Sequence, residues 1–308
     1  MATKPLLLQT GDSIGLVSPG SPLDANIINT RIETLRNMGF NIVFGKYLYS
    51  FDGITSTTPE RRAEDLMFMF SSPGVKMILP SRGGTGVQSL LPFLDYDVIR
   101  QNPKIITGYS DITVLLNTLY QLSDLTTFHS LMLPDFRSDT PSYNFNQFFE
   151  SVSTLTQPRV IQNPPNMPQI SLVRGNVTGP IVGGNITSLM NTFATPYEID
   201  TKGKILFLED INTPTNMMYR YFTQLSMAGK LEDCIGIVIG ECTNCPVSYG
   251  TTLEMLINEW LVPLGKPLMV NVATGHGFNK ASIPIGANVN LNTNENRLTV
   301  LEATVRRT

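Results

Sequence analysis

The amino-acid sequence predicts an α/β protein whose first half forms a doubly wound, mostly parallel sheet. Over the first part of the chain, short apolar runs alternate with segments whose apolar residues recur at helical spacing. Such strand–helix repetition places helices on both faces of a parallel sheet. The chain of 308 residues is long enough for one large domain or two of ordinary size. With 42% hydrophobic and 15% charged residues, its composition is that of a globular protein.

Strands and helices are expected in alternation through the first half. The strands cover residues 14–17, 40–44, 75–79 and 104–107. The helices carry apolar faces over residues 28–35, 63–70 and 112–119. Gly39 can end the first helix. Thr58 followed by Pro59 is typical of an N-cap with proline at the first helical position.

Proline, asparagine and serine become frequent between residues 135 and 170. The stretch 164–168 (Pro-Pro-Asn-Met-Pro) cannot form a regular helix, so we expect a linker here, with a short helix around residues 145–152. A second region begins near Gly175. Its expected strands are residues 205–208, 235–239, 287–292 and 298–301, and its expected helices are residues 217–227 and 253–261. This divides the chain into an N-terminal domain, residues 1–160, and a C-terminal domain, residues 170–308.

Charge and hydropathy argue against two classes of partner. The net charge is −3 and no basic run stands out, whereas phosphate binding needs clustered lysine and arginine, so we expect no nucleic acid. No segment is apolar over the length of about 18 residues that a membrane helix needs. The first residues lack the apolar stretch of a secretory signal. We therefore expect a cytoplasmic protein, the alternative being an exported form cut from a longer precursor.

The three cysteines are Cys234, Cys242 and Cys245. An odd, small number in a chain of this length does not make a disulfide framework. Cys242 and Cys245 have the spacing of a redox or zinc motif, but zinc would need two further ligands and the histidines lie elsewhere in the sequence. We expect free thiols beside a strand and no metal site.

Serine chemistry at neutral pH usually needs a nearby base, most often histidine. Only two histidines occur in the chain, His129 and His276. His276 lies between two glycines, which indicates an exposed tight loop, whereas His129 can equally be a structural residue at a strand end. The spacing alone leaves the choice between the two open.

Ser110 is the candidate nucleophile. It follows a buried strand and precedes an amphipathic helix, which is the setting of a nucleophile elbow, although the second glycine of the common elbow motif is missing. Gly108 allows a neighbouring backbone to approach closely. The helix that begins at Asp111 offers unpaired N–H groups to a developing oxyanion. A serine that merely caps this helix is the alternative.

A glycine-rich loop, residues 82–86 (Arg-Gly-Gly-Thr-Gly), follows the third expected strand. Glycines at such a position free backbone N–H groups for an anion. The loop is not a dinucleotide fingerprint, since Ser89 stands where that motif has its third glycine. Gly83 or Gly84 could supply a second N–H to the oxyanion, and Arg82 could pair with a substrate carboxylate. A simple tight turn is the alternative.

Glu209 and Asp210 end an apolar run between the serine and His276. Strand ends of this kind point into crevices, so either acid could orient a histidine. The order serine, acid, histidine is one of the known chain orders of a catalytic triad.

Taken together, these segments resemble the serine LD-carboxypeptidase family, which includes muramoyl-tetrapeptide carboxypeptidases and microcin C immunity peptidases. The resemblance runs in order through residues 18–19 (Ser-Pro), 82–86, 94–96 (Leu-Asp-Tyr), 103–113, 183–185 (Gly-Gly-Asn), 206–210 (Leu-Phe-Leu-Glu-Asp) and 275–277 (Gly-His-Gly). Departures occur at three places. Ser130 follows His129 where the family often has glycine, Thr85 replaces a usual aromatic, and Tyr219 with Arg220 is all that matches a stretch after the acid.

The resemblance implies a role for each candidate. Ser110 would be the nucleophile, Glu209 the orienting acid and His276 the base, with an oxyanion hole from the N–H of Asp111 and of a glycine at 83–84. The implied fold has the doubly wound N-terminal domain and a C-terminal β-rich α/β domain, with the site between them. It also implies a homodimer and no cofactor.

The implied activity is that of a serine carboxypeptidase, which cleaves the LD bond of murein tetrapeptides and releases the terminal D-alanine. Two alternatives stand beside it. One is a microcin C-type peptidase acting on aminoacyl- or peptidyl-nucleotides, and the other is a non-catalytic module that binds an anion or nucleotide through the glycine loop. A glutamine amidotransferase-like domain would need cysteine at position 110.

Overall fold

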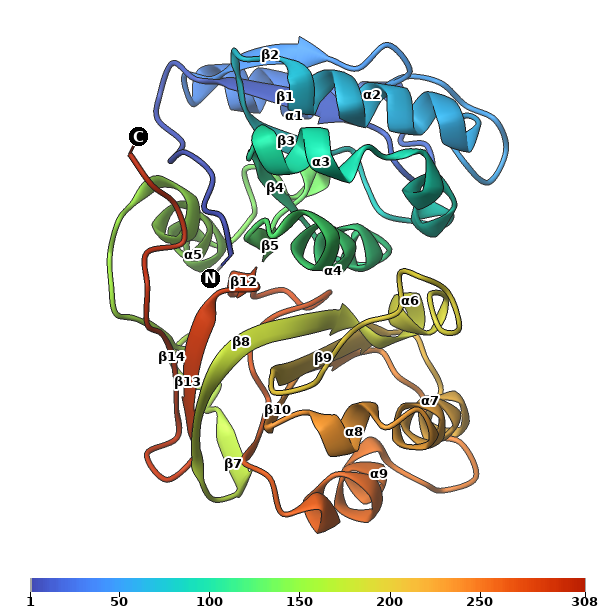
Figure 1. The fold of residues 1–308 in the computed structure, drawn as a ribbon, viewed down its shortest axis with the longest axis vertical. Coiled ribbons are helices and arrows are strands. Elements are labelled where there is room, and N and C mark those ends of the chain that lie inside the picture. Colours follow the sequence, from blue (N-terminus) through green and yellow to red (C-terminus); the bar gives the residue numbers. More distant parts are fainter. Residues whose placement is uncertain (1, 308) are drawn as a thin grey trace.

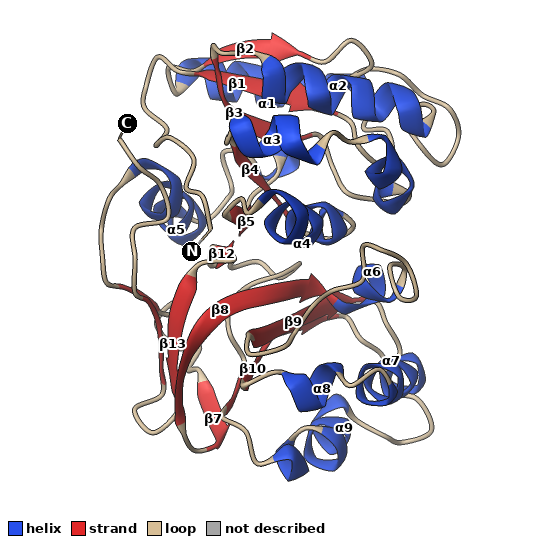
Figure 2. Ribbon diagram, viewed as in Figure 1, coloured by secondary structure: helices blue, strands red, loops and turns tan. Residues whose placement is uncertain are grey.

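Two sheets form the core of the chain, and each belongs to one lobe (Figure 1). The computed structural model describes residues 2–307. The N-terminal lobe is built on a six-stranded sheet and the C-terminal lobe on an eight-stranded sheet. Helices flank both sheets (Figure 2), so the predicted α/β class is confirmed.

The N-terminal lobe alternates strands and helices along the chain. Its elements are β1 (Ser13–Val17), α1 (Ala25–Asn37), β2 (Asn41–Phe44), α2 (Pro59–Ser71), β3 (Val75–Pro80), the 3-10 helix η1 (Val87–Phe93), α3 (Tyr96–Gln101), β4 (Ile105–Gly108), α4 (Ile112–Ser123), β5 (Thr127–His129), the 3-10 helix η2 (Leu133–Asp135) and α5 (Ser142–Ser153). The strand order is β12-β5-β4-β3-β1-β2, where β12 (Ile283–Ile285) is antiparallel to β5 and the other pairs are parallel. This is a doubly wound sheet, and such sheets bind ligands beyond the carboxyl ends of their strands.

The C-terminal lobe is richer in strands. Its elements are β6 (Arg159–Ile161), β7 (Ile170–Val173), β8 (Asn176–Asn185), α6 (Ile186–Met190), β9 (Ile205–Ile211), α7 (Thr215–Met227), α8 (Lys230–Asp233), β10 (Gly236–Thr243), α9 (Leu253–Trp260), the 3-10 helix η3 (Val262–Leu264), β11 (Leu268–Val270), β13 (Asn288–Asn292) and β14 (Arg297–Val300). The order is β6-β14-β13-β8-β9-β10-β11-β7. Strands β8 to β11 run parallel and the flanking pairs are antiparallel.

The chain crosses between the lobes more often than a division into residues 1–160 and 170–308 implies. Strand β12 leaves the C-terminal lobe and pairs with β5, which covers an edge of the first sheet that would otherwise be open. Strand β6 spans position 160 and joins the second sheet. Near its end the chain returns to its beginning, where the N–H of Arg306 donates to the carbonyl of Pro5 at 2.9 Å. The two lobes are therefore tied together by backbone hydrogen bonds.

Most of the predicted elements are present, and the N-cap is confirmed, since Thr58 Oγ1 accepts from the N–H of Arg61. The short helix expected in the linker is also present, as α5. Strand β8 was not predicted. It contains one proline and three glycines, residue types that are depleted in strands, so its pattern carries no strand signal.

The glycines of β8 are explained by its contact with α4, which lies between the two sheets (Figure 1). Asn117 of α4 donates to the carbonyl of Gly183 and accepts from the N–H of Gly183, both at 2.8 Å. Thr113 Oγ1 accepts from the N–H of Asn185 at 3.0 Å. A Cβ on Gly184 would lie 2.7 Å from Thr113 Oγ1, so only glycine permits this approach. The contact brings the ends of β8 and β9 to the first turn of α4.

We expect Asn117→Ala to lower the free energy of unfolding by about 2 kcal/mol, because the buried polar groups of Gly183 lose their partners. The exposed Asn26 of α1 offers a matched control, and Asn26→Ala is expected to change stability by less than about 0.5 kcal/mol. Urea denaturation followed by circular dichroism measures both values. Equal losses in the two variants would contradict the importance of the α4–β8 contact.

Candidate active site

Ser110 occupies a sharp turn between β4 and α4. Its φ is 59°, a left-handed conformation that is strained for a residue with a side chain and that is found at nucleophile elbows. A Cβ at Gly108 would lie 2.7 Å from Cγ2 of Ile112, so the turn closes only with glycine there. Within residues 2–307, the Ser110 hydroxyl has no hydrogen bond, and the residue is half-buried. The side chain is thus held in an elbow with its hydroxyl free for another partner.

The glycine-rich loop meets the elbow through Gly83. A Cβ on Gly83 would lie 2.9 Å from the backbone nitrogen of Asp111 and 3.0 Å from Cβ of Ser110, so the space beside that N–H exists because residue 83 is glycine. Gly84 instead faces Ser21. Arg82 is exposed and forms no ion pair with any residue in the described range.

Two buried charged side chains, Arg62 and Asp111, hold the loop in place, and no sequence pattern predicts this role for either of them. The carboxylate of Asp111 accepts from the N–H of Val87 at 2.8 Å, and burial raises the pKa of this carboxyl. The guanidinium of Arg62, on α2, donates to the carbonyls of Pro19 at 2.7 Å and Gly86 at 2.9 Å. These contacts fix the glycine loop against the elbow.

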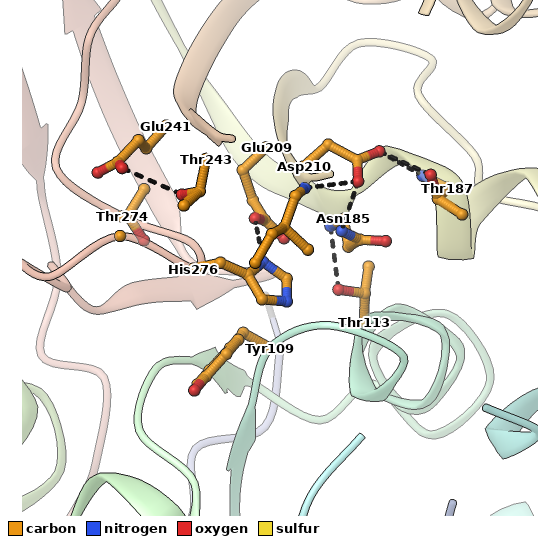
Figure 3. Close-up of polar contacts among 12 residues, drawn as sticks. Tyr109, Thr113, Asn185, Thr187, Glu209, Asp210, Glu241, Thr243, Thr274 and His276 are labelled. Atoms are coloured by element: carbon orange, nitrogen blue, oxygen red, sulfur yellow. Dashed lines mark hydrogen bonds and ion pairs between the residues drawn. The ribbon is translucent and has the colours of Figure 1, made fainter. Parts of the chain in front are cut away.

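Glu209 and His276 form a short polar contact in the site (Figure 3). Glu209 Oε2 lies 2.8 Å from His276 Nδ1, and the glutamate side chain is fully buried near the end of β9. Burial alone would raise the pKa of Glu209, but the interactions with the two histidines outweigh it and lower the pKa to about 2. Glu209 is therefore a carboxylate throughout the physiological pH range.

The loop after β11 brings His276 beside the elbow. The imidazole lies between Glu209 and the ring of Tyr109, which it meets edge-on at a centroid distance of 5.0 Å (Figure 3). Tyr109 immediately precedes Ser110. Each of the two glycines that flank the histidine lies against a carboxylate that leaves no room for a side chain. A Cβ on Gly275 would lie 2.5 Å from Glu209 Oε2, and one on Gly277 would overlap the carboxylate of Glu241.

The sequence left open the choice between Glu209 and Asp210 and the choice between His129 and His276. The contacts of Asp210 and His129 distinguish them from Glu209 and His276. Asp210 accepts from the N–H and the hydroxyl of Thr187 at 3.1 and 2.8 Å and from the hydroxyl of Thr213 at 3.0 Å. It therefore secures the start of α6 and does not contact His276. His129 lies on the other side of Glu209, with its Nε2 3.6 Å from Glu209 Oε1. The structure thus brings both histidines to one carboxylate.

Comparison with known proteins decides the family. The LD-carboxypeptidase N-terminal domain matches residues 14–130, and the LD-carboxypeptidase C-terminal domain matches residues 178–291. The chain belongs to the LD-carboxypeptidase family. A probable murein peptide carboxypeptidase of Bacillus subtilis is 35% identical over 98% of this chain and 95% of its own.

A further relative carries the name of an immunity protein, and a solved structure carries the same protein name. The microcin C7 self-immunity protein MccF of Escherichia coli is 28% identical over 96% of this chain and 94% of its own. A solved structure of MccF in complex with glutamyl sulfamoyl guanosine superposes with a TM-score of 0.92 at 23% identity, covering 98% of this chain and 99% of that one. The likeness to this structure shows the two-lobed fold, and membership of a peptidase family makes the chain a hydrolase.

Sequence reasoning missed a polar cluster that supports Tyr109 in this LD-carboxypeptidase site. The Tyr109 hydroxyl lies 3.3 Å from Asp135 Oδ1, and Lys280 Nζ lies 3.5 Å from the same oxygen and 5.3 Å from the centre of the Tyr109 ring. Burial raises the pKa of Tyr109. The three residues are far apart in the sequence and form no motif, so no signal could have found them.

The described residues contain neither a cluster of metal ligands nor a membrane-spanning helix. Across residues 2–307, no group of three or more histidine, cysteine or acidic side chains is arranged to hold a metal ion. Over the same range no helix is long and apolar enough to cross a membrane. Cys234, Cys242 and Cys245 are free thiols.

Glu209 also makes the stability of the fold depend on pH. Its pKa falls from about 4.5 in the unfolded chain to about 2 in the folded protein, so its contribution is fully present above pH 4.5 and is lost as the pH falls towards 2. We expect the wild type to lose about 2 kcal/mol more than Glu209→Gln between pH 5 and pH 3.

Urea unfolding at the two pH values measures this difference. Glu254→Gln is the control, because Glu254 is exposed on α9 and forms no ion pair within residues 2–307. The control should follow the wild type. A Glu209→Gln variant that also follows the wild type would show that the buried carboxylate is not held by the histidines.

Proposed function

We propose that the chain is a serine carboxypeptidase that cleaves the LD bond of murein tetrapeptides and releases the terminal D-alanine. The observation that carries the proposal is the Glu209–His276 contact of 2.8 Å beside a strained serine elbow. A buried carboxylate bonded to Nδ1 leaves Nε2 of the same imidazole as the free base, which is the arrangement that activates a serine. The 35% identity to a probable murein peptide carboxypeptidase supports the substrate class.

In the proposed reaction, His276 Nε2 takes the proton of the Ser110 hydroxyl as Oγ attacks the carbonyl carbon of the LD bond. Glu209 keeps the proton of the neutral imidazole on Nδ1 and stabilises the imidazolium that forms. The imidazolium then gives its Nε2 proton to the leaving amine, and D-alanine departs. Water, deprotonated by the same nitrogen, attacks the acyl-enzyme and restores Ser110.

The N–H of Asp111 and the N–H of Gly83 are the proposed donors to the oxyanion. Gly83 is favoured over Gly84 because a Cβ placed on Gly83 would meet Asp111 N and Ser110 Cβ, so Gly83 lies directly beside the elbow. Donors fixed in advance at such a point stabilise the charge that develops on the carbonyl oxygen. Arg62 and Asp111, which anchor the loop, would maintain this geometry.

The microcin-type alternative would bring a nucleotide base to the site. The only tryptophan, Trp260, is part of α9 and packs edge-on against Tyr219 at 5.4 Å, so it is not placed on a mobile loop for base stacking. This favours the murein peptide. A panel of murein tetrapeptides, muropeptides and aminoacyl-nucleotide conjugates, read by mass spectrometry, tests the choice directly. Turnover of the nucleotide conjugates alone would replace the murein proposal by the microcin one.

We expect Ser110→Ala to lose at least ~10³-fold in turnover with its fold intact, as in other triads. A fluorophosphonate should label the wild type at residue 110 and leave the variant unlabelled. Ser71→Ala, an exposed substitution of the same kind on α2, is the control. Normal D-alanine release by Ser110→Ala would remove Ser110 from the mechanism, whereas the absence of labelling and of turnover in the wild type would favour a non-catalytic binding module.

Arg82 is the proposed partner of the free carboxylate of D-alanine, because it is exposed on the glycine loop and has no acidic partner among the described residues. We expect Arg82→Gln to raise KM about tenfold with little change in kcat, since a charged hydrogen bond contributes about 1.5 kcal/mol. Arg220→Gln, an exposed arginine on α7, is the matched control. Identical KM values in the two variants would remove Arg82 from substrate binding.

A further inference from the structure

The carboxylate of Glu209 has a hydrogen bond on only one of its two oxygens. Oε2 contacts His276, whereas Oε1 is buried without a hydrogen-bond partner in the described residues. The group that faces Oε1 is the imidazole of His129, whose Nε2 is 3.6 Å away. Both nitrogens of His129 are likewise buried and unpartnered within residues 2–307. Leaving a buried charged oxygen and a buried N–H both unpaired is costly, so the two groups are natural partners.

Packing holds the His129 ring in this direction. The side chain is 1% exposed, and its ring meets Phe207 of β9 edge-on at a centroid distance of 4.9 Å. A Cβ on Gly184 would lie 3.0 Å from Cδ2 of the imidazole, so β8 closes over the ring only because residue 184 is glycine. In the sheet, His129 pairs with Gly108, at the base of the elbow. The ring therefore cannot turn to solvent and remains directed at Glu209.

We propose that His129 is a positioning residue, whose Nε2–H holds Oε1 of Glu209 so that Oε2 stays on His276. The inference rests on the proposed function, because it assigns a role within the proposed triad. It also explains why a chain with only two histidines places both on one acid.

The proposal fixes the proton of each imidazole. A nitrogen that faces a carboxylate must carry hydrogen, so neutral His129 has its proton on Nε2, whereas neutral His276 has its proton on Nδ1. Another titratable group beside His129 is Tyr109. Asp135 contacts the hydroxyl of Tyr109, and Lys280 lies over the Tyr109 ring. A charged His129 would compete with the imidazolium of His276 for the same carboxylate. The neutral form supports Glu209 and leaves its charge for the base.

Loss of the Nε2–H donor should therefore affect the chemistry through Glu209. Without this donor the carboxylate keeps more negative charge on Oε2 and can rotate about its own axis. The first effect holds the proton on His276 more firmly, so the acid limb of the pH–rate profile moves to higher pH. The second disorders the base and lowers the rate. A purely structural histidine would produce neither change in protein that remains folded.

A pair of amide substitutions separates the two roles. The side-chain amide of glutamine can place a donor where Nε2 of His129 lies, whereas that of asparagine reaches only the position of Nδ1. The readout is the second-order rate of Ser110 labelling by a fluorophosphonate between pH 5 and pH 9, normalised to folded protein. This rate requires the base but not the correct peptide. His129→Phe fills the same space without a donor and replaces His129→Asn should that variant fail to fold.

We expect His129→Asn and His129→Phe to lose about 10- to 100-fold in labelling rate, the range known for groups that orient metal ligands, because His129 would orient Glu209 in the same indirect way. Their acid limb should move to higher pH, and His129→Gln should recover most of the rate and the wild-type limb. Wild-type rates and profiles in folded His129→Phe would overturn the inference while Ser110 labelling stands. Failure of the wild type to label at all would instead overturn the proposed function.

Discussion

A buried carboxylate, Glu209, is the constraint on which the site depends. A charge removed from water is tolerated only when it is paired, and breaking a buried pair costs about 3–5 kcal/mol. His276 and His129 approach its two oxygens from different parts of the chain. The acid thus joins β9 of the second sheet to β5 of the first and to the loop after β11. Its low pKa is the electrostatic expression of the same arrangement.

The rest of the fold keeps the two lobes in one relative position. Strand β12 completes the first sheet from within the C-terminal part of the chain, and Asn117 of α4 binds the backbone of Gly183 on β8. Gly184 lies where β8 meets α4 of the other lobe, because a Cβ there would collide with Thr113. Gly275 lies against Glu209 within the C-terminal lobe, where a Cβ would collide with the carboxylate. The Gly-Gly-Asn and Gly-His-Gly segments are therefore packing requirements of the site as well as marks of the family.

Local patterns predicted the alternating strands and helices of the first half, together with the serine turn after β4. This was possible because apolar runs and helical spacing are visible within a few consecutive residues. Long-range contacts were not predictable in this way. Nothing in residues 283–285 indicates that they pair with β5. The ten-residue strand β8 was not predictable either, because its glycines remove the strand pattern from the sequence. The sequence also posed His129 and His276 as alternatives, whereas in the structure both contact Glu209.

The central claim is that the carboxylate of Glu209 holds the two imidazoles in opposite tautomers. Nitrogen NMR of protein labelled with ¹⁵N-histidine measures it most directly, because the chain has only two histidines and their signals can be assigned with His129→Gln. At neutral pH the account predicts His276 with its hydrogen on Nδ1 and His129 with its hydrogen on Nε2. Two imidazoles in the same tautomer, or His276 carrying its hydrogen on Nε2, would contradict it.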